Sequence, residues 1–322
     1  MKCPCLRDII FGNYPLTYCK NKRYNPPLYN KKYKEDVEMT VCIAAICELG
    51  NGIIGASDRL KTAGDVTFEA SQKFFGITDS IAIMTAGDVN FQTDILLELT
   101  NIVKAKESTW YIKDIAQEYV KIRNSLILKK LNNKVFSKFG LTQDNFLKIE
   151  NSLSAQTLER IYHEKDELLN SIPTVSVIIT GIDVDGTQLY VVRDDDISCH
   201  NQSGFASIGG GSRHARSQFM SEKYTIDWRF SDTLLLIHNA KKRSEIAPGV
   251  GYNTDMFLIE QVKTLQNTYE VNVNTIDQNI IFNLDKIYKN IIKKESNIQL
   301  SAQKKVDLYI NNILGKNNEK SE

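Results

Sequence analysis

The feature that most constrains the fold of this chain is a pair of apolar segments near its start, joined by a short turn. The first segment runs from Met39 to Cys47, and the second runs from Ile53 to Ser57. Between them stands Gly50-Asn51-Gly52, a typical turn sequence. Apolar runs of this length bounded by turn residues predict two paired β-strands. Thr40 then lies at the start of the first strand, and Asp58 at the end of the second.

Two further segments add reactive groups to this hairpin. Lys73 stands just before another apolar run, and residues 81–87 read as a strand that ends in Gly87. With Thr40 and Asp58, the chain therefore supplies a hydroxyl nucleophile, an acid, an amine and a backbone N–H for an oxyanion. These are the groups that an amide hydrolase with an N-terminal threonine requires.

The chemistry sets conditions on Thr40 and Lys73. A threonine hydroxyl needs a base, and the α-amine of a chain start, with a pKa of about 7.7–8.0, can serve near neutral pH. Thr40 must then be the first residue of the mature chain, whereas an internal Thr40 reads as an ordinary strand residue. Lys73 is followed by Phe74 and Phe75, which favours a desolvated ammonium that pairs with Asp58.

These residues, in this order, resemble the front of a proteasome β-type subunit, and most of all the small bacterial and archaeal proteasome-like proteins. The matching positions span residues 40–88 and are Thr40, Asp58, Thr62-Ala63-Gly64, Lys73 and Ala86-Gly87. The resemblance implies an α+β fold of four layers (αββα), the N-terminal-nucleophile hydrolase fold, with two antiparallel sheets covered by helices. It also implies catalytic roles for Thr40, Asp58, Lys73 and the N–H of Gly87, and substrate binding by Thr62 and Thr85.

The distal part of the chain departs from the family pattern. The family carries a serine in a Gly-Ser-Gly-Ser loop that positions the terminal amine, and the corresponding loop here is Gly-Gly-Gly-Ser at 209–212. Gly210 therefore replaces the supporting serine. Two roles are open for Ser212: its hydroxyl replaces that of the missing serine from one turn away, or it caps the following helix. The family's Asp and Ser before the last strand lack clear counterparts, and Glu245 is the one candidate.

The chain divides by composition into three parts. Residues 1–38 read as a disordered extension, a propeptide, or sequence upstream of a true start at Met39. Residues 39–265 form the expected hydrolase domain, with an enlarged helical segment at about 90–170 that includes 141–169. Residues 266–322 form a helical appendage, with helix over 275–314 and a solvated tail over 315–322.

The remaining elements follow from periodicity and turn residues. A strong hairpin signal stands at Asp185-Gly186. We expect helices from about 213 and from 231, and strands over 73–77, 80–85, 175–182, 188–193, 205–208 and, as the last strand, 256–262.

Composition excludes several classes of function. The chain carries 40 basic and 39 acidic residues, so charge favours neither nucleic acid nor an anionic membrane as a partner. No apolar run approaches the roughly 18 residues of a membrane span. Cys42 and Cys47 lie in one strand on opposite faces, which favours reduced thiols and a cytoplasmic protein. We expect no cofactor and no metal, since Asp194-Asp195-Asp196 reads as a solvated turn.

The expected function is a threonine-type peptidase that forms an acyl-enzyme on Thr40. Two alternatives stay open: a non-catalytic, proteasome-like structural subunit, and an amidase for a small molecule with the same N-terminal nucleophile. The expected partners are a peptide or unfolded protein as substrate and further copies of the chain; an unfoldase is possible but unidentified.

Overall fold

The computed structural model describes residues 40–63, 66–69, 72–106, 110–263 and 269–318. The predictions for residues 1–38, Met39 and Gly64 lie outside these ranges. The chain divides into two compact units, Met1–Thr275 and Ile276–Glu322. Each unit is described by itself.

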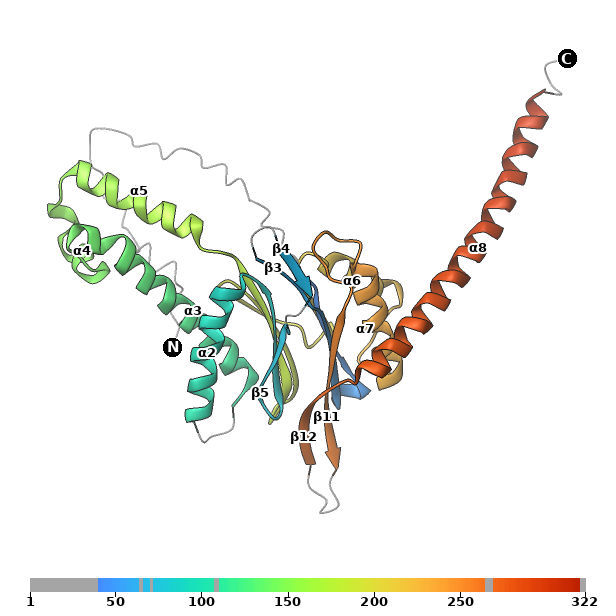
Figure 1. Ribbon diagram of the computed structural model, residues 1–322, viewed down its shortest axis with the longest axis horizontal. Helices are drawn as coiled ribbons and strands as arrows, with labels where there is room; N and C mark the ends of the chain where they lie inside the picture. Colours follow the sequence, from blue (N-terminus) through green and yellow to red (C-terminus); the bar gives the residue numbers. More distant parts are fainter. Residues whose placement is uncertain (1–39, 64–65, 70–71, 107–109, 264–268, 319–322) are drawn as a thin grey trace. The chain divides into compact units, whose positions relative to one another are not determined.

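The first unit is an α+β structure with two five-stranded antiparallel sheets (Figure 1). The first sheet has the strand order β10-β1-β2-β11-β12, and the second has the order β5-β6-β7-β8-β9. A separate two-stranded ribbon joins β3 and β4. The strands are β1 (Cys42–Cys47), β2 (Gly52–Asp58), β3 (Leu60–Ala63), β4 (Val66–Glu69), β5 (Phe74–Thr78), β6 (Ile81–Gly87), β7 (Val175–Asp183), β8 (Gly186–Arg193), β9 (Asp196–Cys199), β10 (Phe205–Ile208), β11 (Thr254–Lys263) and β12 (Tyr269–Thr275).

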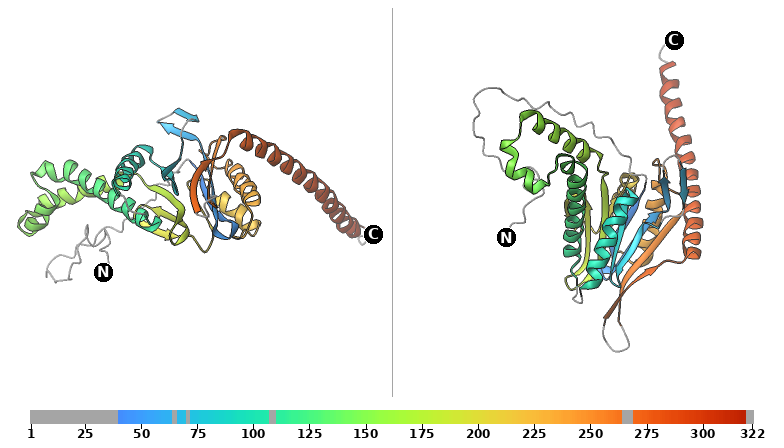
Figure 2. Two further views of the ribbon diagram at one scale, coloured as in Figure 1. Left: turned by 90° about the horizontal axis from the view of Figure 1, so that it is seen from below. Right: turned by 60° about the vertical axis from the view of Figure 1, so that its left-hand side comes forward.

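Helices lie on the outer faces of the two sheets. Helices α2 and α3 contact the second sheet, whereas α6 and α7 contact the first, and two further views show the same arrangement (Figure 2). The α-helices of this unit are α2 (Val89–Ala105), α3 (Ile112–Lys134), α4 (Gln143–Ile149), α5 (Ala155–Ser171), α6 (Ser212–Ser221) and α7 (Phe230–Ser244). Short 3₁₀ turns stand at Glu48–Gly50, Phe136–Phe139 and Glu150–Ser152.

Strand β1 is buried on both faces because it lies centrally in its sheet. Cys42, Ala44 and Ile46 belong to the cluster between the sheets, together with Met84 of β6 and Ile178 of β7. The alternate residues of β1 face the other way, where α7 and α6 contact the strand. A second cluster fills the space between the second sheet and α2, α3 and α5. The start of β1 is thereby fixed from both sides.

The predicted hairpins are confirmed. Strands β1 and β2 pair from Cys42↔Ser57 to Cys47↔Gly52. Strands β7 and β8 pair up to Asp183↔Gly186, and Gly186 has a φ of 92° that the turn requires. The first strand begins later than predicted, at Cys42, so Thr40 lies two residues before it. The N–H of Asp58 still donates to the carbonyl of Val41 at 3.2 Å, which keeps Thr40 beside Asp58.

Several elements differ from the prediction. The predicted last strand is followed by another, β12, whose residues alternate between polar and apolar and pair with β11. Strands β3, β4 and β9 have four residues each and carry too little periodic signal to be predicted. The helix expected over 141–169 is two helices, α4 and α5, because Ser154 caps a new helix through the N–H of Thr157.

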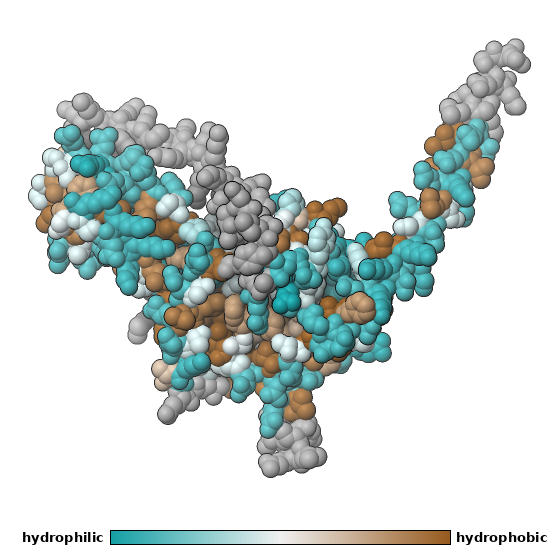
Figure 3. Space-filling view, viewed as in Figure 1, coloured by the Kyte–Doolittle hydropathy of each residue, from teal (hydrophilic) through white to brown (hydrophobic). Residues whose placement is uncertain are grey.

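The second unit contains one long helix, α8 (Gln278–Asn318). It continues past residue 314 into the predicted solvated tail. Four large apolar side chains of this helix form one stripe, in which Ile298, Val306, Tyr309 and Ile313 are 70%, 51%, 67% and 63% exposed, whereas Leu300 and Leu308 lie on other faces. Figure 3 shows such apolar patches (brown) among hydrophilic residues along the helix. The stripe has the three- and four-residue spacing of an amphipathic helix.

Within the described residues, no helix is both long enough and apolar enough to cross a membrane.

Candidate functional site

The candidate site lies where β1 begins and β2 ends. The hydroxyl of Thr40 donates to Oδ1 of Asp58 at 2.6 Å and accepts a hydrogen bond from Nζ of Lys73. Lys73 also forms an ion pair with Oδ1 of Asp58 at 2.8 Å. The three side chains that the sequence predicted to meet are therefore in direct contact.

Asp58 is the structural centre of this cluster. Its side chain is completely buried, so each carboxylate oxygen needs donors. Oδ1 accepts from the N–H of Val41 at 2.9 Å in addition to Thr40 and Lys73, and Oδ2 accepts from the N–H groups of Leu60 at 3.1 Å and Gly251 at 3.0 Å. Such a set of donors fixes the orientation of the carboxylate.

Lys73 reaches the cluster from the second sheet. It precedes β5, and its carbonyl accepts from the N–H of Thr85 at 2.9 Å, which ties its backbone to β6. Phe74 is buried against Phe257, at a centroid distance of 4.9 Å, whereas Phe75 is exposed. The predicted pairing of Lys73 with Asp58 is confirmed, with the Lys73 side chain 9% exposed.

The turn between β10 and α6 packs against the backbone of Thr40 and forms a hydrogen bond with it. The carbonyl of Thr40 accepts from the N–H of Gly211 at 3.1 Å. Gly209 has a φ of 85°, and a Cβ at this position would lie 2.4 Å from the carbonyl oxygen of Thr40. Only glycine fits such a contact. The glycine-rich loop therefore serves close approach to Thr40.

The N–H of Gly87 points toward the edge of β6 that carries Lys73. The N–H of Thr85 donates to Lys73 across this edge, and N–H groups two residues apart in a strand point the same way. The carbonyl of Ala86, on the other side of the same peptide group, accepts from Nε2 of Gln92 at 3.1 Å. Gln92 in turn accepts from the hydroxyl of Tyr119 at 2.8 Å. Gln92 thus fixes the peptide plane that presents the N–H of Gly87.

The other predicted site residues take varied positions. Thr85 is half-buried on β6, and its carbonyl accepts from the thiol of Cys42 at 3.3 Å. Thr62 lies on β3. Ser212 is the first residue of α6 and is buried, but the N-cap is Gly211 and has no side-chain capping bond. The capping role considered for Ser212 is therefore wrong.

Two supports of the site were missed from the sequence. Lys241 on α7 is fully buried, and its Nζ donates to the carbonyls of Gly251 and Tyr252, both at 2.8 Å. Burial lowers the pKa of Lys241, although Glu245, which pairs with it at 2.6 Å, acts in the opposite direction. Glu245, the candidate for the family's distal acid, thus acts on the cluster indirectly, through Lys241 and through Lys242, which lies 2.7 Å from it. Because Gly251 donates to Asp58, Lys241 holds the loop that supports the cluster.

Glu69 is the second support. Its carboxylate accepts from the N–H of Tyr252 at 2.6 Å and of Asn253 at 3.2 Å, so it fixes the same loop from β4. No sequence motif marks these residues, because the partners lie more than a hundred positions apart in the chain.

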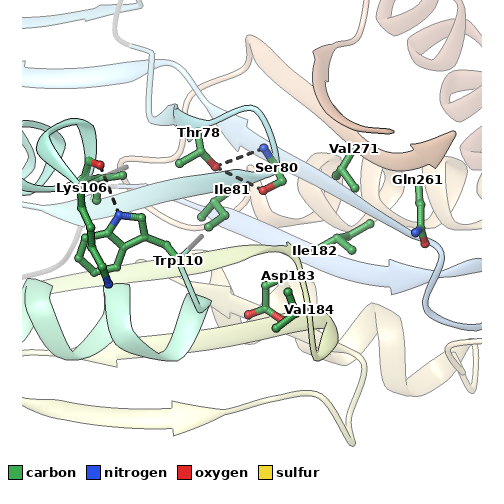
Figure 4. Close-up of a pocket in the computed structure, with 11 residues that line it drawn as sticks. Thr78, Ser80, Ile81, Lys106, Trp110, Ile182, Asp183, Val184, Gln261 and Val271 are labelled. Carbon is green, nitrogen blue, oxygen red and sulfur yellow. Dashed lines mark hydrogen bonds between the residues drawn. The ribbon is translucent and has the colours of Figure 1, made fainter. Parts of the chain in front are cut away.

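A pocket at the far end of the sheets is separate from this cluster. Figure 4 shows its lining, which includes Thr78, Ser80, Ile182 and Gln261. Thr78 and Ser80 belong to the turn region of the β5–β6 hairpin, whereas Lys73 and Gly87 lie at the opposite ends of these strands. This pocket therefore takes no part in the Thr40 cluster.

Among the described residues, no group of three or more His, Cys, Asp and Glu side chains is arranged to hold a metal ion. In comparisons with known proteins, no protein-family model and no curated sequence matches this chain.

Proposed function

We propose that the protein is a threonine-type peptidase of the N-terminal-nucleophile fold, whose nucleophile is the hydroxyl of Thr40. The observation that carries the proposal is the contact of this hydroxyl with a buried ion pair, Asp58–Lys73. A threonine with a purely structural role needs no buried ion pair beside it, because a single backbone carbonyl can accept the hydrogen bond of its hydroxyl.

The proposed reaction begins when the α-amine of Thr40 takes the proton of its own hydroxyl. The oxygen attacks the carbonyl carbon of the peptide, and the N–H of Gly87 donates to the resulting oxyanion. The C–N bond then breaks, and the ammonium returns the proton to the departing amine. The same amine then takes a proton from water, whose oxygen attacks the ester carbon. The bond between this carbon and the Thr40 oxygen breaks, the ammonium returns the proton to that oxygen, and the acid is released.

Lys73 and Asp58 tune this step. The Lys73 ammonium stabilises negative charge as it develops on the threonine oxygen, and the ion pair with Asp58 fixes the position of the ammonium. In the full chain, the nitrogen of Thr40 is an amide bonded to Met39, and an amide is not a base at neutral pH. The active form must therefore begin at Thr40, either by removal of residues 1–39 or by translation from Met39 followed by loss of Met39.

The proposal also covers the substrate, the assembly and the cellular location of the protein. We infer that the substrate is a peptide or an unfolded protein, that copies of the chain associate, and that the protein works in the cytoplasm. Burial raises the pKa of the Cys47 thiol to about 12, which supports a reduced and unreactive cysteine on β1.

The test is covalent labelling of Thr40. Protein produced from a start at Met39, with Met39 removed, is incubated with a peptide epoxyketone and examined by mass spectrometry. We expect one adduct on Thr40, no adduct in Thr40→Ala, and none in the full chain, whose Thr40 lacks a free amine. Absence of an adduct and of peptide hydrolysis in protein confirmed to begin at Thr40 would contradict the proposal. Hydrolysis of small amides without hydrolysis of peptides would favour the amidase alternative.

A further inference from the structure

A cavity of about 440 Å³ opens next to the Thr40 cluster and takes no part in the reaction steps above. One side of its lining comes from the adjacent ends of β7 and β8, including Thr174 and Arg193. The other side comes from the β10–α6 turn and the first turns of α6, including Gly209, Arg213 and Arg216. The two sheets thus contribute facing walls.

Two residues of the cavity lining lie directly against Thr40 and Gly87. Its wall residue Gly209 approaches Thr40 so closely that an added Cβ would lie 2.6 Å from Cγ2 of Thr40. On the other wall, the carbonyl oxygen of Thr174 lies 2.5 Å from the position that a Cβ of Gly87 would take. A peptide bond held between Thr40 and Gly87 therefore has its neighbouring groups within reach of this cavity.

The charge of the lining is strongly positive. It contains three arginines, 193, 213 and 216, and one acid, Asp194. Asp194 is engaged elsewhere, since its Oδ1 pairs with Arg123 at 2.7 Å. Asp196 lies opposite Arg193 in the β8–β9 pair. No carboxylate in the described part of the chain forms an ion pair with any of the three arginines.

The arginines act on one another, and Arg216 is held by a hydrogen bond. Nε of Arg216 donates to the hydroxyl of Ser207 at 3.3 Å, and this hydroxyl donates to the carbonyl of Ser212 at 3.0 Å. Burial, together with Arg193 and Arg213, lowers the pKa of Arg216. An anion placed between these groups relieves their repulsion. The N-terminus of α6, which has no side-chain cap, adds partial positive charge on the same wall.

We propose that this cavity is a subsite for a carboxylate of the substrate, so that the enzyme prefers peptides with an acidic group near the bond that it cleaves. Guanidinium groups bind carboxylates through paired, charge-assisted hydrogen bonds. The carboxylate belongs either to an Asp or Glu side chain or to the end of the peptide chain. The inference deepens the proposed function and rests on it.

The first test compares hydrolysis of three peptides by the protein that begins at Thr40. One peptide carries Glu near the cleaved bond and an amidated end, the second carries Gln in its place with an amidated end, and the third carries Gln with a free terminal carboxylate. We expect kcat/KM to be about tenfold higher for at least one of the two charged peptides than for the neutral one at low salt, and the ratio to fall as salt rises. The charged peptide that is preferred identifies the source of the carboxylate.

Variants that neutralise arginines test whether the preference for charged peptides arises in this cavity. In Arg213→Gln/Arg216→Gln, the ratio of charged to neutral peptide is expected to fall below about twofold. The matched control is Arg160→Gln/Arg229→Gln, which removes the same charge from exposed sites outside the cavity and is expected to keep the wild-type ratio. Equal kcat/KM for all three peptides in protein that labels on Thr40 would overturn the subsite and leave the proposed function standing.

A binding measurement separates the two proposals if hydrolysis fails. Fluorescent versions of the peptides are titrated against the Met39-start protein that carries Thr40→Ala, with anisotropy as the readout. Tighter binding of a charged peptide, lost in the Arg213→Gln/Arg216→Gln background, supports the subsite even without turnover. Equal affinities for charged and neutral peptides overturn it.

Discussion

At the scale of single residues, the Asp58–Lys73 pair yields a prediction that separates stability from chemistry. Lys73→Met leaves Asp58 buried without its counter-ion, which is expected to cost about 3 kcal/mol of unfolding free energy. Asp58→Asn/Lys73→Met removes both charges and is expected to recover at least half of that loss. Neither variant should form the epoxyketone adduct, because the hydroxyl has lost its positive neighbour. Urea unfolding and mass spectrometry measure the two effects.

Two results would contradict this account of the pair. A Lys73→Met protein with the same free energy of unfolding as the wild type would mean that the backbone N–H donors alone are sufficient to stabilise the buried Asp58 carboxylate. Full labelling of Thr40 in the double variant would mean that the charge of Lys73 has no part in activating the hydroxyl.

Part of the Thr40 cluster was accessible from sequence through a short-range rule, because a two-strand hairpin brings Thr40 beside Asp58. Lys73 comes from the other sheet, and the order and spacing of the resembling motif predicted its place. Lys241, Glu69 and Gln92 were not accessible, because hydrogen bonds from a side chain to a backbone group leave no motif in the sequence. The arginine cavity was missed because its two walls come from separate sheets.

At the scale of elements, the β10–α6 turn should tolerate no side chain at Gly209. Gly209→Ala must accept a left-handed backbone, which costs about 1 kcal/mol, and in addition a contact of 2.4 Å with the Thr40 carbonyl. Gly186→Ala is the matched control, because its φ of 92° is equally unfavourable but nothing lies within 4 Å of the added Cβ. We expect Gly209→Ala to lose at least about 2 kcal/mol and Gly186→Ala about 1 kcal/mol by urea unfolding. Equal losses of unfolding free energy in the two variants would show that the turn accommodates the added Cβ without displacing Thr40.

The prediction of strands and helices succeeded where turn residues and long apolar runs mark an element. It failed for short elements that are recognised in the structure by their pairing. The Asp-Gly turn and the apolar runs of β1, β2 and β7 were sufficient to define hairpins. Strand β12 alternates the polar Glu270, Asn272 and Asn274 with Val271 and Val273, and it was missed because this segment was assigned to the helical appendage. The α4–α5 break follows from a single capping serine, Ser154, inside a long helical pattern.

At the scale of the whole molecule, the exposed apolar stripe of α8 predicts association between copies of the chain. A single solvated helix gains little from such residues, whereas helix pairing buries them. We expect an oligomer by light scattering at micromolar concentration, and a smaller mass for Ile298→Glu/Val306→Glu. Asn297→Asp/Asn311→Asp adds the same charge on the opposite face of the helix and should keep the wild-type mass. A monomeric wild-type protein across this range would exclude the prediction.

The way in which Thr40 is held has a consequence for regulation. Its described contacts are made by its hydroxyl and its carbonyl, while its nitrogen is still bonded to Met39. Under the proposed function, the Thr40 cluster is assembled before its base exists, so a chain that still carries Met39 has the cluster but lacks activity. Activation would then require cleavage of one bond and no change in the described contacts, so the timing of that cleavage would set the onset of proteolysis.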